Sequence, residues 1–410
     1  MPVTLDKIPP LAPRPARPRI WLWLGLLLSG LLLGVGGTLL FGDETLPQKP
    51  DEFWRLALGV PFLSWCALGF GRMLFHIGEH AAADGWDEAR EEVLIRKIRQ
   101  GRRSQQVLGV SWYTALRAPG EPPASQLEAL LSATKALKAQ PSRLDLTTSG
   151  HSRLSGGTDA DLKRTLQRIL ASVLADLAPT LARLPDGAPL ALLLELDSGL
   201  SEDQWRQVWQ KAWRGSGIRQ ATSPVEGSGL AALDQWLDQR IDDQALLMVV
   251  AVRFAPEQPE GTAEVAVGLL FGNRLTQTTL APIAYLHRPE EKRKSTSDDL
   301  LYATRQALDW VPLDAQSIKQ VWRVGIDVQR EAAIATVLTE MPVAVTHKQG
   351  ICNLDALLGQ PGKASPWLAI AAATQMIESG AGAQFIFSGG GAGTDSLWGT
   401  VLTPVPTLSK

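Results

Sequence analysis

An uncharged run of apolar residues near the start of the chain most limits what this sequence can fold into. It covers residues 20–41, IWLWLGLLLSGLLLGVGGTLLF, and its only polar side chains are Ser29 and Thr38. About 20 helical residues, at about 1.5 Å each, cross the hydrocarbon core of a bilayer, which is about 30 Å thick. A cleavable signal peptide would have a shorter apolar region and a small-residue cleavage site. The run therefore predicts a membrane-spanning helix.

A second apolar run follows at residues 56–75, LALGVPFLSWCALGFGRMLF. Glycine and proline weaken a soluble helix but are tolerated in membrane helices, and Arg72 near its end can reach the headgroups. The alternative is an interfacial or buried helix. We expect residues 20–75 to form a two-helix membrane anchor in contact with lipid.

The charges beside the two runs predict an orientation. Basic residues precede the first run and follow the second (Arg14, Arg17, Arg19; Arg96, Lys97, Arg99, Arg102, Arg103), whereas acidic residues predominate in the short loop between them. Lysine and arginine gather on the cytoplasmic side of membrane proteins. We therefore expect a two-pass protein of a bacterial inner membrane with both termini in the cytoplasm.

Composition excludes several classes of protein. The chain has 410 residues and a formal net charge of −2, which gives no bulk electrostatic reason to bind nucleic acid. Cys66 and Cys352 are its only cysteines, too few for a disulfide framework or a cysteine metal site. Residues 1–19 are rich in proline and arginine and predict a disordered basic tail, and residues 76–105 predict a juxtamembrane helix.

The remaining chain alternates helical and strand patterns, as in α/β proteins. One order of elements, helix then strand then strand, occurs twice. The first copy covers residues 230–240, 245–254 and 263–271, and the second covers 366–379, 383–388 and 397–404.

This repeat resembles the duplicated halves of the thiolase and ketoacyl-synthase fold. The resemblance implies a thiolase-like α/β domain with halves at 106–290 and 291–410. Together with the two apolar runs, it predicts an α/β protein in which a transmembrane helical hairpin precedes that domain. Gln360 stands where that family has a histidine, and SPVEGSGL (223–230) lacks the nucleophilic cysteine. Since neither glycine nor glutamine replaces a thiolate or an imidazole, the resemblance implies a domain without catalytic activity.

A narrower resemblance covers the C-terminal part. The segments APIAYLHRP (281–289) and LLGQPGKASPWLAIAAATQMI (357–377) are similar to the C-terminal domain of the type VI secretion lipase-adaptor family. That resemblance implies an accessory protein that binds a lipase-like effector or a spike component.

Other motifs were weighed as catalytic or metal sites. HIGEH (His76, Glu79, His80) has the spacing of a zinc site, but it adjoins the second apolar run and a third ligand is not evident. Glu195 and Asp197, at the end of a strand pattern, are candidate acids. SGGGAGTDS (388–396) indicates a glycine-rich hairpin turn more than a phosphate loop. We therefore predict no catalytic residue, no cofactor and no metal.

The resulting hypothesis is a membrane-anchored, non-enzymatic accessory protein of type VI secretion. Tyr285, His287 and Arg288 are its expected partner-binding residues, at a surface rim, because arginine and aromatic side chains often dominate interfaces. The alternative is that His287 and Arg288 only tie the two halves together. Two other functions remain open: an immunity protein that neutralises a toxin, and a degenerate thiolase-like protein that still binds or converts an acyl ligand.

Overall fold

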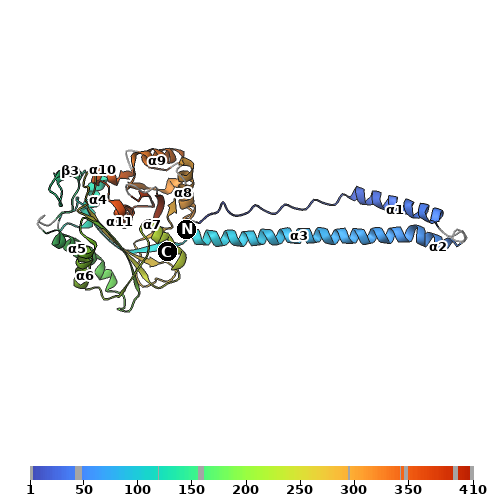
Figure 1. The fold of residues 1–410 in the computed structure, drawn as a ribbon, viewed down its shortest axis with the longest axis horizontal. Coiled ribbons are helices and arrows are strands. Elements are labelled where there is room, and N and C mark those ends of the chain that lie inside the picture. The colour runs from blue at the N-terminus through green and yellow to red at the C-terminus, as the bar shows by residue number, and fades with distance from the viewer. Residues whose placement is uncertain are drawn as a thin grey trace. The chain divides into compact units, whose positions relative to one another are not determined.

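The computed structural model describes residues 3–41, 49–118, 120–155, 161–293, 296–341, 343–345, 350–390 and 396–406. Two compact units divide the chain. One comprises Thr4–Lys97, and the other comprises Val3 with Ile98–Lys410. They are called the hairpin unit and the globular unit below, and each is described by itself (Figure 1).

The hairpin unit consists of helices. Its elements are α1 (Ile20–Phe41), α2 (Pro50–Trp54), the π-helical turn η2 (Arg55–Gly59) and α3 (Val60–Gly101). Helices Ile20–Phe41 and Pro50–Gly101 are both long and apolar enough to cross a membrane. The predicted second span and the predicted juxtamembrane helix therefore belong to one continuous helix, because no residue between them breaks it.

Close backbone packing joins α1 to the following turn. A Cβ built on Gly34 would lie 2.2 Å from the carbonyl oxygen of Ala57 and 2.4 Å from Cγ of Pro61, so only glycine fits there. Small residues allow such approach between helices. Farther along, Trp65 Nε1 donates to the carbonyl oxygen of Trp23 at 2.8 Å, within hydrogen-bonding distance.

Side chains of α3 contact the segment before α1, for which disorder stays a prediction. The carboxylate of Asp87 accepts from the backbone N–H of Ala12, at 2.8 Å, and from Arg14. Trp86 and Arg90 donate to the carbonyl oxygens of Pro10 and Pro9. Side chains of α3 thus hydrogen-bond backbone groups of a proline-rich segment whose described residues form no helix or strand of their own.

The globular unit is built from two copies of one strand order. The first half contains β1 (Ser104–Tyr113), α4 (Pro123–Leu131), β2 (Lys138–Pro141), β3 (Thr148–His151), α5 (Leu162–Leu181), β4 (Leu190–Ser198), α6 (Glu202–Gly215), β5 (Thr222–Pro224), α7 (Gly229–Gln239), β6 (Leu246–Phe254) and β7 (Val265–Asn273). The second half contains β8 (Ala284–His287), β9 (Glu290–Glu291), α8 (Ser297–Asp309), η3 (Ala315–Ser317), β10 (Gln320–Val324), α9 (Val328–Glu340), β11 (Ile351–Asn353), α10 (Leu354–Leu358), η4 (Gly362–Ala364), α11 (Ser365–Glu378), β12 (Gln384–Gly389) and β13 (Leu397–Pro404).

The sheet topology confirms the duplication. The strands follow the order β11-β10-β12-β13-β8-β1-β7-β6-β4-β5. In each half two parallel pairings are followed by two antiparallel ones, and the antiparallel pair β1–β8 joins the halves. The second half thus begins with β8, earlier than the expected boundary at residue 291, because a strand of four residues gives little sequence signal.

Three hydrophobic clusters separate the layers. One packs α5 and α6 on the first half of the sheet, one packs α8 and α9 on the second half, and the largest surrounds α7 and α11 between them. Helix α11 has eleven of its fourteen residues buried, and it contacts strands of both halves. A helix that is apolar on all sides belongs inside a protein, which places α11 at the centre of the unit.

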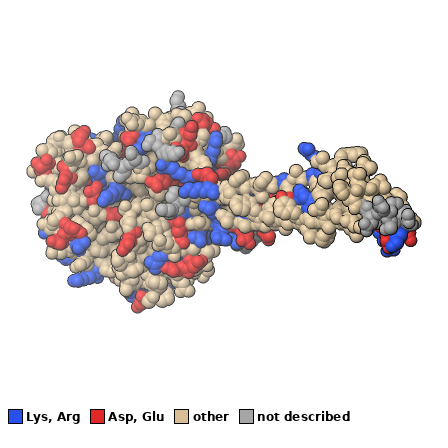
Figure 2. All heavy atoms as spheres, turned by 45° about the vertical axis from the view of Figure 1, so that its right-hand side comes forward, with Lys and Arg blue, Asp and Glu red and all other residues tan. Residues whose placement is uncertain are grey.

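Charges are distributed differently on the two units. On the face shown in Figure 2, lysine and arginine are interspersed with aspartate and glutamate over the globular unit, whereas most of the hairpin surface carries neither. This distribution fits a water-exposed domain and an apolar anchor, each taken by itself.

Candidate functional site

A pocket lies where the two central helices begin. It has a volume of about 220 Å³, and the residues that line it come from both halves. They are Glu195 on β4, Ser228, Gly229, Leu230 and Ala231 at the start of α7, Lys363 and Pro366 before and in α11, Ser388, Gly389 and Gly390 at the end of β12, Glu291, Ser396 and Trp398. Helix N-termini expose backbone N–H groups, so this position favours ligands with a partial or full negative charge.

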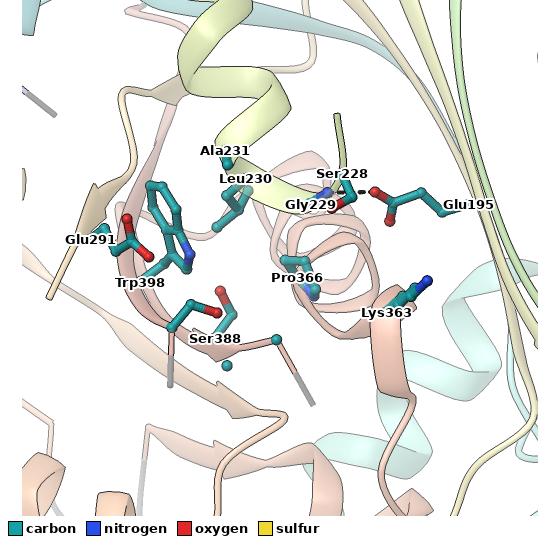
Figure 3. A pocket seen from close by; sticks show the side chains of 13 residues that line it. Glu195, Ser228, Gly229, Leu230, Ala231, Glu291, Lys363, Pro366, Ser388 and Trp398 are labelled. Carbon is teal, nitrogen blue, oxygen red and sulfur yellow. Dashed lines mark hydrogen bonds between the residues drawn. The ribbon is translucent and has the colours of Figure 1, made fainter. Parts of the chain in front are cut away.

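Glu195 is the buried carboxylate of this pocket. Only 7 % of the residue is exposed. One oxygen accepts from the backbone N–H of Gly229, the first residue of α7 (Figure 3). The other accepts from Trp367 Nε1 at 2.8 Å. Burial raises the pKa of Glu195, while the two hydrogen bonds and nearby Lys363 oppose that increase. A carboxyl group tuned in this way can hold a proton closer to neutrality than an exposed one.

Ser228 and Ser388 add hydroxyl groups to the wall of the same pocket. Ser228 precedes Gly229 in the chain, is exposed, and makes no side-chain cap hydrogen bond. Ser388 is 1 % exposed, and within the described part of the chain its Oγ has no hydrogen-bond partner. A buried hydroxyl without a partner costs about 1–3 kcal/mol, so a ligand that bonds Ser388 gains from an existing deficit.

The nucleophile and histidine of the thiolase resemblance are not found in this pocket. Ser228 and Gly229 stand where the helix should begin with a cysteine, and none of the residues given above is a histidine or cysteine. Cys352 lies on β11, where burial raises its pKa to about 12, so it stays a thiol. Gln360 uses its backbone carbonyl to accept from Arg253 Nη1 at 3.0 Å, and it does not line the pocket.

The two candidate acids of the sequence separate in the structure. Both lie on β4, but only Glu195 lines the pocket. Asp197 pairs instead with Arg253 on the neighbouring strand β6, at 3.5 Å. Of the glycine-rich segment 388–396, Ser388, Gly389, Gly390 and Ser396 line the pocket, and residues 391–395 lie outside the described residues. Sequence analysis missed Ser228 and Ser388, because a lone serine carries no signal until the fold brings it to a pocket.

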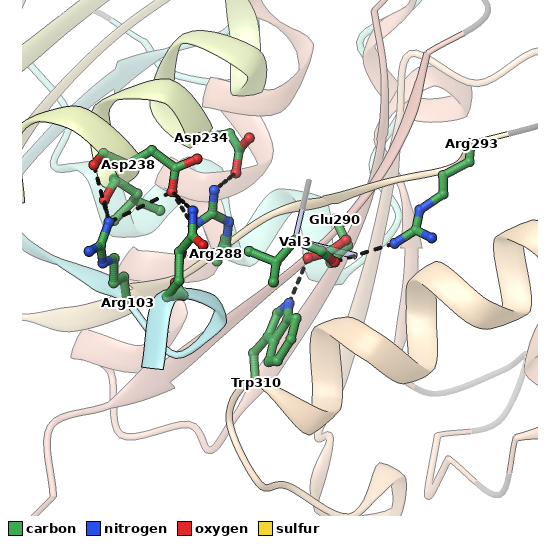
Figure 4. A network of polar contacts seen from close by, with 10 residues as sticks. Val3, Arg103, Asp234, Asp238, Arg288, Glu290, Arg293 and Trp310 are labelled. Atoms are coloured by element: carbon green, nitrogen blue, oxygen red, sulfur yellow. Dashed lines mark hydrogen bonds and ion pairs between the residues drawn. The ribbon is translucent and has the colours of Figure 1, made fainter. Parts of the chain in front are cut away.

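Tyr285, His287 and Arg288 do not form the expected surface rim. Arg288 is fully buried and pairs with Asp234 and Asp238 at 2.7 Å each (Figure 4). His287 is buried as well, and burial lowers its pKa to about 4. The alternative of a structural role agrees with these contacts. Partner binding by the three residues stays a prediction, with only Tyr285 partly exposed.

The Arg288 contacts also involve the last turn of α3. Arg288 Nη1 donates to the carbonyl oxygen of Gln100, and Gln100 Nε2 donates to Asp238 at 2.7 Å. Nearby, Trp310 Nε1 donates to Glu290 at 2.6 Å, and burial raises the pKa of Glu290 to about 7. The contacts of Arg288 and Gln100 with Asp238 hold the C-terminal end of α7, opposite to the end at the pocket.

The HIGEH segment lies on α3. The rings of His76 and His80 contact each other edge to face, with 4.5 Å between their centres, and Glu79 pairs with Arg72. Within the described residues, no group of three or more histidine, cysteine or acidic side chains could hold a metal ion.

Comparison with known proteins identifies similar folds but no similar sequence family. No protein-family model matches the chain, and no curated protein matches its sequence. Among solved structures, the PfaC keto synthase–chain length factor has a TM-score of 0.51 and 12 % identity over 75 % of this chain, which spans only 43 % of that one. A type II polyketide synthase ketosynthase complexed with its acyl-carrier protein has a TM-score of 0.50 and 11 % identity over 74 % of this chain and all of that one. Human mitochondrial 3-ketoacyl-CoA thiolase is more distant, with a TM-score of 0.45 and 9 % identity over 75 % of this chain and all of that one. The globular unit has the thiolase and ketosynthase fold.

These findings correct the functional hypothesis. Nothing among them supports the type VI secretion adaptor family, so the prediction of an accessory protein that binds an effector or spike component is wrong. The prediction that the chain is not an enzyme is corrected with it, because the solved structures that share this fold include ketosynthases. Since the described residues of the pocket include neither the cysteine nor the histidine, any chemistry in it would have to use other side chains. Glu195 and Ser228 line the pocket and carry groups that can act as a base and a nucleophile.

Proposed function

We propose that the globular unit binds an acyl thioester in the pocket at the start of α7 and α11 and transfers its acyl group. The observation that carries this proposal is the buried carboxylate of Glu195, held at the first backbone N–H of α7 inside the pocket. The ketosynthase and thiolase names of the structural relatives support acyl chemistry as the class of reaction. The small volume of the pocket favours a short acyl group.

In the proposed reaction, the oxygen of Ser228 attacks the thioester carbonyl carbon. Glu195 takes the hydroxyl proton as the new ester bond forms, and the carbon–sulfur bond breaks to release a thiolate. The proton then passes to the thiolate, which leaves as a thiol, so atoms and charges balance. The N-terminal dipoles of α7 and α11 stabilise negative charge on the carbonyl oxygen.

The test uses full-length protein in detergent with acetyl- and hexanoyl-coenzyme A. We expect release of the free thiol and a Ser228 acyl ester detectable by intact-protein mass spectrometry. S228A abolishes the ester, and E195Q slows thiol release by about 10²–10⁴-fold, because one general acid–base group contributes that much. D197N is the matched control on the same strand and leaves the rate unchanged. Release of thiol at equal rates in all four proteins would sink the proposal.

We propose further that the hairpin unit anchors the protein in a bacterial inner membrane with both termini in the cytoplasm. The basic residues that flank the two apolar runs support this orientation. A C-terminal alkaline phosphatase fusion should be inactive and a C-terminal fluorescent-protein fusion bright. An active phosphatase would place the globular unit on the other side of the membrane.

A further inference from the structure

The hairpin unit contains a large groove between the start of α1 and the middle of α3. Its volume is about 810 Å³, within the range of ligand sites. Apolar and aromatic side chains form most of it, among them Trp23 and Trp65, whose hydrogen bond bridges the two helices. None of the described residues that line it is acidic.

Two guanidinium groups lie in the same part of this groove. Arg17 precedes Trp23 by six residues and Arg72 follows Trp65 by seven, or about 10 Å of helix. Because α1 and α3 run in opposite directions from the Trp23–Trp65 contact, both arginines lie toward the end where α1 begins. That end borders the apolar spans, at the level where headgroups meet water.

Arg72 keeps donor capacity for a ligand. Its Nη1 atom is buried and makes no hydrogen bond within the described residues, and its ion pair with Glu79 is long, at 3.5 Å. Guanidinium groups bind phosphate oxygens through paired N–H donors. Basic pockets between membrane helices bind the headgroups of anionic lipids.

We infer that this groove is a binding site for one anionic phospholipid. The phosphate lies between Arg17 and Arg72, and an acyl chain follows the aromatic wall formed by Trp23 and Trp65. Gly69 makes room for that chain, since a Cβ built on it meets nothing within 4 Å. This inference rests on the proposed membrane anchor.

The experiment uses full-length protein in nanodiscs of equimolar phosphatidylcholine and phosphatidylglycerol. Lipids retained after detergent extraction are counted by native mass spectrometry. We expect one retained phosphatidylglycerol. R72Q weakens its retention about fivefold, the effect of one basic residue at an anionic membrane surface. R55Q, the same substitution at the other end of the hairpin, leaves retention unchanged.

A second pair of variants tests how the shape of the groove, apart from its charge, contributes to lipid binding. G69L fills the groove and expels the lipid, whereas G71L, two residues away and outside the groove, does not. Equal retention of the two lipids in all variants would overturn the inference and leave the anchor intact. Loss of the protein from membranes on carbonate washing would overturn the anchor and this site together. A dimer abolished by G69L in lipid-free detergent would assign the groove to a second copy of the chain instead.

Discussion

Helices α7 and α11 occupy equivalent places in the two halves and both begin at the pocket, yet they are held in place by different forces. Helix α11 is buried on nearly every side, and its buried Ser365 and Thr374 bond carbonyl oxygens close by in the chain. Helix α7 carries the buried Asp234, which is held by Arg288. Since α7 also buries Leu233 and Trp236 in the central cluster, the duplication preserves the arrangement of elements while α11 relies on apolar packing and α7 adds a buried ion pair to it.

The largest expected effect comes from removing the charge that holds α7. R288A removes the cation that pairs with Asp234 and Asp238, and breaking a buried ion pair lowers the free energy of unfolding by about 3–5 kcal/mol. Thermal unfolding of the detergent-solubilised chain measures the loss. R274A, at an exposed arginine that stacks on Tyr285, should change stability by less than about 0.5 kcal/mol. An unchanged melting temperature in R288A would show that packing, not charge, fixes α7.

The same charged region should make stability depend on pH. Burial raises the pKa of Glu290 from 4.5 to about 7, so the folded state binds the proton more tightly than the unfolded state. Stability due to this group is therefore complete below about pH 4.5 and is lost as the pH rises through 7, by about 3 kcal/mol. E290Q should remove this dependence, and the difference between the two proteins should grow between pH 4.5 and 8. Parallel curves over that range would contradict the assignment.

The packing around α11 is tested by a substitution that enlarges a buried side chain, whereas the tests on α7 remove a charge. Ala372 is fully buried on α11, so A372L should cost about 1–3 kcal/mol through overpacking. Ala231, at the start of α7, is exposed and lines the pocket. A231L should therefore leave stability almost unchanged while it hinders ligand binding. Equal destabilisation by the two substitutions would remove the contrast between the helices.

The smallest expected loss of stability is at the pocket wall contributed by the second half. Since Ser388 Oγ has no partner in the described part of the chain, S388A breaks no hydrogen bond there and removes a buried, unpaired hydroxyl, so it should not lower the free energy of unfolding. Its effect should appear instead as weaker binding of the acyl thioester. A clear loss of stability in S388A would show that the hydroxyl supports the fold.

Much of the fold could be predicted from periodicity, but the seam between the halves, the antiparallel pair β1–β8, could not. The repeated order of helix and two strands predicted the duplication, because α11 and the strands beside it are long and uniformly apolar. Strand β1 escaped prediction, since it begins with Ser104, Gln105 and Gln106, polar side chains that are buried only through pairing with β7 and β8.

The candidate site was predictable only in part. Glu195 was noticed as a polar residue at the end of an apolar strand. Its burial follows from Gly229 and Trp367, which are distant in sequence and contribute the hydrogen bonds that it accepts. Arg288 was placed at the surface, as isolated arginines usually are. Its burial depends on aspartates on α7, a pairing that no local pattern reveals.

The seam between the halves has a consequence for how the chain is made. Strand β1 pairs with β7, which begins about 160 residues later, and with β8 beyond it. At about 5–20 residues per second, a ribosome needs roughly 10–30 s to supply that first partner. The apolar helices leave the ribosome before β1, so insertion of the proposed membrane anchor would precede closure of the sheet. During that interval β1 has an open edge, and a chaperone that covers strand edges would act most effectively then.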